Sequence, residues 1–285
     1  MEKNNNIILN KLFTRSTLQG LIKNNNDRLY KSIVKKYLKE VDNKYNKDII
    51  SDIYKVMDKK YRNEYFYKNT LFNKLVLGRH SLNTATALTE LPVSKSKADF
   101  ILINKNNAIL YEIKTGLDTF ERLDTQLQDY KKAFKFIYVV TCDSNYEKLY
   151  SILKESRVGI CILNSNKSIS IKKKAVEDSS ELCHDIMFKI LRKSEFENVL
   201  IKYYGELPQT SQVKYYDACM DMFRNINIDL AYDYLIGELK KRINVNINEY
   251  KKYVPYELGI LLYLLDFKKE EFIQLDEFLN RKFRG

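Results

Sequence analysis

Two apolar segments joined by a short polar loop constrain the fold of this chain most. Residues 98–103 and 108–113 are rich in β-branched and aromatic side chains, which is typical of strands. The loop between them, Asn104-Lys105-Asn106-Asn107, has strong turn chemistry. We therefore predict an antiparallel hairpin with a four-residue loop, in which Ile103 faces Ala108.

This register brings three charged side chains together. Asp99 lies directly opposite Glu112 on one face of the sheet, and the two-residue period of a strand adds Lys114 to that face. Two opposed carboxylates destabilise a sheet, so a hard divalent cation such as Mg²⁺ is a natural reason for the pair. The alternative is a solvated hairpin face that carries only a weak ion pair.

The segment before the hairpin extends the pattern. Residues 84–91 alternate in part between apolar and polar side chains and predict a preceding strand. This strand would bring Glu90 to the same site, either as a further metal ligand or as a partner for Lys114.

The segment after the hairpin predicts a helix and a strand. Residues 118–121, Asp-Thr-Phe-Glu, resemble a capping box that opens a helix running to about Phe134. Its apolar stripe follows helical spacing and consists of Leu123, Leu127, Tyr130 and Phe134. Residues 136–141 then predict a buried strand, and a right-handed parallel return would hold Gln126 and Arg122 near the carboxylates.

Residues 80–142 resemble the PD-(D/E)XK nuclease superfamily, including poorly characterised bacterial and phage members. Asp99 matches the first acidic position, Glu112-Ile113-Lys114 matches the (D/E)-x-K motif, and Gln126 with Tyr130 matches the RecB-like Q-x-x-x-Y helix. The chain departs from the pattern at Ala98, where the family name leads one to expect proline. The resemblance implies an α/β fold with a restriction-endonuclease-like αβββαβ core between helical flanks.

The resemblance also implies hydrolysis of phosphodiester bonds by metal-activated water. Asp99, Glu112 and the backbone carbonyl of Ile113 would hold Mg²⁺ or Mn²⁺, with Glu90 as an additional ligand. Lys114 would orient or help deprotonate the nucleophile, or steady the transition-state charge, and Gln126 would position the site or the scissile phosphate. The nucleic-acid contacts expected near it are Arg122, Lys95 and Lys97. Packing of the helix is the main role expected of Tyr130.

Composition agrees with a nucleic-acid substrate. The formal net charge is +12, and residues 1–89 contain 18 Lys/Arg against 8 Asp/Glu, although a lysine-rich composition alone also makes surfaces basic. We expect DNA as the partner, with RNA as an alternative. The four cysteines form no zinc motif, no signal peptide is evident at the start, and no apolar run is long enough to cross a membrane. These features predict a cytoplasmic protein with reduced thiols.

We expect three regions: a basic helical N-terminal region (1–79), a nuclease core (80–175) and a C-terminal helical region (176–285). The predicted function is that of a Mg²⁺-dependent deoxyribonuclease. The alternative is a nucleic-acid-binding or partner-binding protein that keeps the nuclease fold but is silent or needs an activator. A homodimer or a protein activator is compatible with either prediction.

Overall fold

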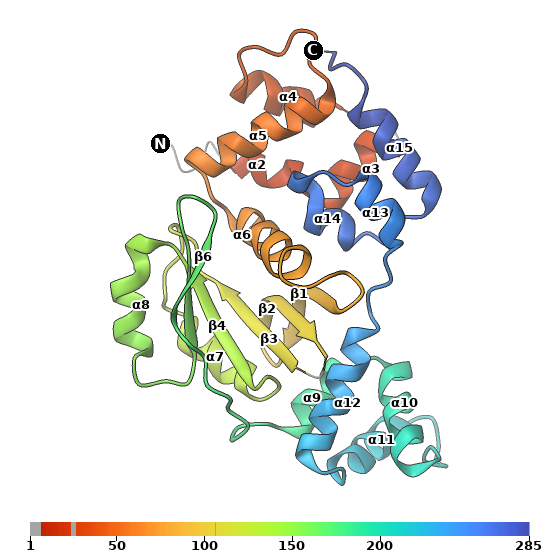
Figure 1. Ribbon diagram of the computed structural model, residues 1–285. Helices are drawn as coiled ribbons and strands as arrows, with labels where there is room; N and C mark the ends of the chain where they lie inside the picture. The colour runs from red at the N-terminus through yellow and green to blue at the C-terminus, as the bar shows by residue number, and fades with distance from the viewer. Residues whose placement is uncertain (1–6, 24–26, 106, 285) are drawn as a thin grey trace. The chain divides into compact units, whose positions relative to one another are not determined.

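The computed structural model describes residues 7–23, 27–105 and 107–284 (Figure 1). Asn106 of the expected hairpin loop lies outside the described residues, as does the start of the chain where no signal peptide is expected. The chain divides into two compact units. Unit 1 comprises residues 1–83 and 244–285, and unit 2 comprises the continuous segment 84–243.

Unit 2 is built on a six-stranded mixed sheet in the order β1-β2-β3-β4-β5-β6. The strands are β1 (Ala85–Val93), β2 (Ser96–Asn104), β3 (Asn107–Ile113), β4 (Phe136–Thr141), β5 (Gly159–Leu163) and β6 (Ile169–Lys173). The β1–β2, β2–β3 and β5–β6 pairs are antiparallel, whereas β3–β4 and β4–β5 are parallel. The predicted mixed α/β architecture and the parallel return are confirmed.

The hairpin has the predicted register, because Ile103 pairs with Ala108 and Phe100 with Tyr111. The predicted four-residue loop is wrong, because Asn104 also pairs with Asn107 and both strands therefore extend into it. Helices α7 (Leu123–Lys131) and α8 (Tyr146–Leu153) follow β3 and β4, with a 3₁₀ turn, η2 (Asp143–Asn145), before α8. Side chains from α7, α8 and the strands belong to one buried core. The predicted stripe of α7 is buried throughout, since Leu123, Leu127, Tyr130 and Phe134 are each at most 5% exposed.

The predicted capping box at Asp118 is wrong, because α7 begins only at Leu123. The Asp118 carboxylate instead accepts hydrogen bonds from the backbone N–H and the hydroxyl of Thr115, both at 2.7 Å. A short aspartate that bonds nearby backbone in this way favours a turn over a helix start. The helix also ends earlier than predicted, at Lys131.

Four further helices complete unit 2: α9 (His184–Ile190), α10 (Lys193–Tyr204), α11 (Tyr215–Arg224) and α12 (Ile228–Lys240). Their apolar faces join the same core as the sheet. After α12, the Arg242 guanidinium donates to both carboxylate oxygens of Glu195 at 2.7 and 2.6 Å and to the Ile190 carbonyl at 2.7 Å. A nearly buried ion pair therefore ties the end of unit 2 to α10.

Unit 1 is helical. Its elements are α2 (Ile7–Leu12), α3 (Arg15–Lys23), α4 (Arg28–Tyr37), α5 (Asn46–Lys60), α6 (Glu64–Leu71), the π-helix η1 (Phe72–Leu77), α13 (Ile247–Tyr253), the 3₁₀ helix η3 (Tyr256–Leu258), α14 (Gly259–Tyr263) and α15 (Lys269–Leu279). Hydrogen bonds join its two chain segments: the Asn46 side chain donates to the Phe278 carbonyl at 2.9 Å, and the Ile260 N–H donates to the Asn69 side chain at 3.0 Å.

The C-terminal helical region expected from the sequence, 176–285, is divided between the two units. Residues 176–243 pack with the sheet, and residues 244–285 pack with the N-terminal helices. No helix in the described ranges 7–23, 27–105 and 107–284 is long and apolar enough to cross a membrane. The four cysteines are free thiols, as expected.

Candidate active site

Three carboxylates occupy one row across neighbouring strands of unit 2. Thr89 pairs with Phe100 and Leu91 with Ala98, so Glu90 on β1 lies opposite Asp99 on β2. Continuing the β2–β3 register one residue beyond Phe100 and Tyr111 places Asp99 opposite Glu112, as the sequence predicts. Residues opposite one another in an antiparallel pair share a face of the sheet.

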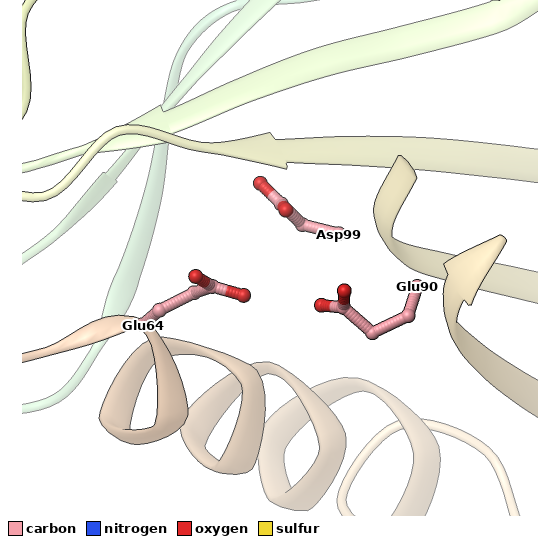
Figure 2. Close-up of side chains that lie close together, drawn as sticks. All are labelled: Glu64, Glu90 and Asp99. Atoms are coloured by element: carbon pink, nitrogen blue, oxygen red, sulfur yellow. The ribbon is translucent and has the colours of Figure 1, made fainter. Parts of the chain in front are cut away.

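Asp99 is half-buried and closes the end of the hairpin ladder. Its Oδ2 atom accepts a hydrogen bond of 2.7 Å from the backbone N–H of Ile113. Figure 2 shows the Asp99 and Glu90 side chains on their two strands, and a carboxylate oxygen of each lies within 4.8 Å of the other. Glu64, also drawn in Figure 2, belongs to unit 1, where it forms an ion pair with Lys68.

Glu112 is 1% exposed and has a hydrogen-bond partner at each carboxylate oxygen. The Lys114 ammonium lies 2.9 Å from Oε1, and the Tyr130 hydroxyl donates to Oε2 at 2.8 Å. Lys114 also donates to the Gln126 side-chain oxygen at 2.7 Å. Gln126 and Tyr130 lie one turn apart on α7, so this helix supplies both contacts to the strand residues.

The Tyr130 contact with Glu112 goes beyond the role predicted from the sequence. Burial raises the pKa of the Tyr130 hydroxyl well above its ordinary value, and the negative charge of Glu112 raises it further. The hydroxyl is therefore protonated and a donor at neutral pH. Its oxygen also lies 2.8 Å from the carbonyl of Lys97 on β2, so Tyr130 joins α7 to two strands. The spacing of Gln126 and Tyr130 is the sequence signal from which the contact of Tyr130 with Glu112 could have been predicted.

Glu90 adopts a backbone conformation that is unusual for a residue inside a strand. Its φ angle is +57°, in the left-handed region that disfavours residues with a side chain. Its exposed carboxylate forms an ion pair of 2.9 Å with Lys97. The structure therefore places Glu90 beside Asp99, whereas Lys114 pairs with Glu112, so the expectation that Glu90 partners Lys114 is not met.

Of the three predicted nucleic-acid contacts, Lys95 is exposed in the β1–β2 connection, Lys97 is exposed on β2, and Arg122 is exposed directly before α7. The connection is held by Asp129, whose Oδ2 accepts from the Lys95 N–H at 3.2 Å and the Ser96 hydroxyl at 2.7 Å. Burial opposes the charge of Asp129, but these hydrogen bonds outweigh it and lower the pKa of the carboxyl. Nothing in the sequence pattern singles out this contact.

The oxygens of Asp99 and Glu90 are of the kind that binds a hard divalent cation. Asp99 and Glu90 place carboxylate oxygens within 4.8 Å of each other, and Glu112 adds a third carboxylate to the row. Such opposed negative charges and all-oxygen donors are what Mg²⁺ or Mn²⁺ takes in proteins. Asp99, Glu112, Glu90 and the Ile113 carbonyl stay the predicted ligands, but among the described residues Glu112 does not join Asp99 and Glu90 in a group whose carboxylate oxygens all lie within 4.8 Å of one another.

Comparison with known proteins gives one family. Residues 57–254, which are 198 of the 285 residues, match the sequence model of a family described as bacteriophage P4 protein cII. Protein cII of Enterobacteria phage P4 is 25% identical over 175 residues, which cover 59% of this chain and 64% of that protein. The match thus spans just under two thirds of the relative's length. No solved structure matches the chain.

Proposed function

This chain belongs to the family of bacteriophage P4 protein cII, and we propose that it is a metal-dependent deoxyribonuclease with a PD-(D/E)XK core. The observation that carries the proposal is the contact network of Glu112, Lys114 and Gln126 beside Asp99. These are the residues that resemble the superfamily's motifs. The sheet and α7 supply them from separate segments of the chain, and Lys114 lies within hydrogen-bonding distance of both Glu112 and Gln126.

The ligands we propose for the cation are the carboxylates of Asp99, Glu112 and Glu90 together with the Ile113 carbonyl. The chemistry that Mg²⁺ or Mn²⁺ supplies at such a site is activation of a water molecule and neutralisation of charge on the phosphate. The backbone N–H of Ile113 fixes one oxygen of Asp99, and this bond orients the carboxylate along the strand end.

Lys114 is the residue we assign to the reacting phosphate or to the attacking water. An ammonium has three N–H donors. Two of them serve Glu112 and Gln126, which leaves a third to donate to a phosphate oxygen. Gln126 acts as a positioning residue, because its side-chain oxygen holds Lys114. Tyr130 positions Glu112 in the same way from the other carboxylate oxygen.

The test is cleavage of linear, circular and single-stranded DNA in Mg²⁺ or Mn²⁺. We expect Asp99→Asn, Glu112→Gln and Lys114→Met each to lower the rate on the order of 1,000-fold, because several kcal/mol of transition-state stabilisation depend on such groups. Asp124→Asn, an exposed carboxylate on α7, is the matched control and should cleave like the wild type. Cleavage that survives all three site variants would refute the proposal.

One observation favours the alternative of a protein that is silent until activated. Glu112 is almost fully buried, and both its oxygens are already bonded to Tyr130 and Lys114. A silent protein would show no metal-dependent cleavage of any DNA, while binding of DNA would be unchanged by Glu112→Gln. RNA is tested in the same assay as a further substrate.

A further inference from the structure

The positive charge of the chain is concentrated in the unit that lacks the proposed active site. Unit 1 contains 25 Lys/Arg and 15 Asp/Glu, whereas unit 2 contains 24 Lys/Arg and 22 Asp/Glu. Ten of the twelve excess positive charges therefore belong to the helical unit. Phosphate contacts supply most of the non-specific affinity for nucleic acids, so unit 1 is where such affinity is expected.

Two hollows in unit 1 lie beside α4. One has a volume of about 180 Å³ and reaches the C-terminal segment after α15, and the other has a volume of about 650 Å³ and follows α4 into the next loop. They share Lys31 and Phe283. We call their joint lining the α4 surface, and its basic residues are Lys31, Lys35, Lys39, Arg281, Lys282 and Arg284.

The charges on the α4 surface are poorly balanced. Its acidic lining residue is Asp27, which lies 3.2 Å from the Lys31 ammonium. Lys282 donates to the amide oxygen of Asn43 rather than to a carboxylate. Within the part of the chain that the structure describes, Lys35 and Lys39 form no ion pair. Six cations against one carboxylate make this surface complementary to a polyanion.

The larger hollow combines three of these cations, Lys31, Lys35 and Lys39, with apolar walls. Leu38, Val41 and Phe283 are each partly exposed in it, and the Phe283 ring packs edge-to-face on Tyr30 with centroids 5.6 Å apart. Unpaired bases stack on aromatic and apolar side chains while cations contact the backbone. In a duplex the bases are already stacked on one another, so the apolar walls would have no role.

We propose that the α4 surface binds single-stranded nucleic acid, with the lysines and arginines on the phosphates and the apolar hollow against a base. The inference deepens the proposed deoxyribonuclease function, on which it rests for the identity of the polyanion. It assigns substrate binding to unit 1 and the reaction to unit 2.

The test measures binding of a labelled single-stranded oligonucleotide, its duplex and phosphatidylserine vesicles to the full chain without divalent metal. The perturbation is the triple variant Lys31→Gln, Lys35→Gln, Lys39→Gln. The matched control removes the same charge from exposed lysines of unit 1 that line neither hollow, as Lys59→Gln, Lys60→Gln, Lys251→Gln.

The triple variant loses three phosphate contacts, so its plot of log affinity against log salt concentration should have a slope shallower by about 2 than that of the wild type. Its affinity for the single strand should then be weaker on the order of 100-fold at about 0.1 M salt. The control variant should bind within about threefold of the wild type. Phe283→Leu, which keeps an apolar side chain against Tyr30, should weaken single-strand binding by about tenfold through lost stacking and leave duplex binding unchanged.

Equal losses in the two triple variants would overturn the inference, because net charge alone would then explain binding. Binding to the vesicles but not to the oligonucleotide would also overturn it, in favour of a membrane surface. Cleavage is measured separately. Single-strand binding that depends on the α4 surface, without cleavage of any substrate, would refute the nuclease proposal alone. If the variant of Lys31, Lys35 and Lys39 still cleaves DNA and binds the single strand as tightly as the wild type, this inference alone is refuted.

Discussion

Tyr130→Phe isolates the hydroxyl that joins α7 to the carboxylate row. The change keeps the ring, which is fully buried, and removes the donor 2.8 Å from Glu112. A hydrogen bond to a charged acceptor contributes about 1.5–3 kcal/mol, and the loss leaves a buried carboxylate oxygen without that donor. We therefore expect the free energy of unfolding of unit 2 to decrease by about 2 kcal/mol.

The corresponding change in melting temperature follows from the size of unit 2. Its 160 residues carry an unfolding entropy of about 2.1 cal/mol/K per residue, so a loss of about 2 kcal/mol lowers the midpoint by about 6 °C. Tyr138→Phe is the control, since the described residues offer its hydroxyl no hydrogen-bond partner. Thermal unfolding followed by circular dichroism measures both variants. Equal midpoints for Tyr130→Phe and the wild type would refute the assigned role of the hydroxyl.

Three further predictions concern unit 2, each measured by thermal or denaturant unfolding. Arg242→Met should lower the free energy of unfolding by about 3–5 kcal/mol, because it leaves the buried Glu195 carboxylate without its partner, and a loss below about 1 kcal/mol would contradict this. Burial raises the pKa of Glu195, but the hydrogen bonds and charge of Arg242 outweigh it and leave the pKa lowered. The stability from this pair is therefore complete above about pH 4.5 and is lost as pH falls through the lowered pKa; Glu195→Gln should remove that acid dependence, and an unchanged pH profile would refute the assignment. Gly159→Ala would place a methyl group into the Tyr138 ring and should destabilise by about 1–3 kcal/mol, whereas Gly237→Ala in α12, with no atom within 4 Å of the new methyl group, should stabilise by about 0.5–1 kcal/mol; the opposite order would contradict the packing.

The hairpin and the carboxylate row could be predicted because short-range geometry determines them. A polar turn between two apolar strands sets the pairing of Ile103 with Ala108, and the strand period then fixes where Asp99 and Glu112 lie. The parallel return to β4 follows from the general handedness of such connections. The predicted start of α7 is wrong because the Asp118 side chain can either cap a helix or close a turn. In the structure it closes a turn with Thr115.

Contacts between distant segments could not be predicted from spacing. Arg242 and Glu195 form a buried pair although 47 positions separate them, and nothing near either residue indicates the other. The same holds for the C-terminal helices, because an amphipathic pattern shows that one face is buried but not which unit buries it. The left-handed conformation of Glu90 also has no sequence signal, since glycine and asparagine are the usual residues at such positions.

Unit 1 is assembled from the two ends of the described chain, and this arrangement has a consequence for the order of folding during synthesis. Unit 2 is one continuous segment, so all of its residues have been made before residue 244 is added. The N-terminal helices of unit 1 must wait for residues 244–285, because partners such as the Phe278 carbonyl for Asn46 lie 232 positions away. Vectorial synthesis therefore completes the sheet unit first, and the basic helical unit closes only when its last segment leaves the ribosome.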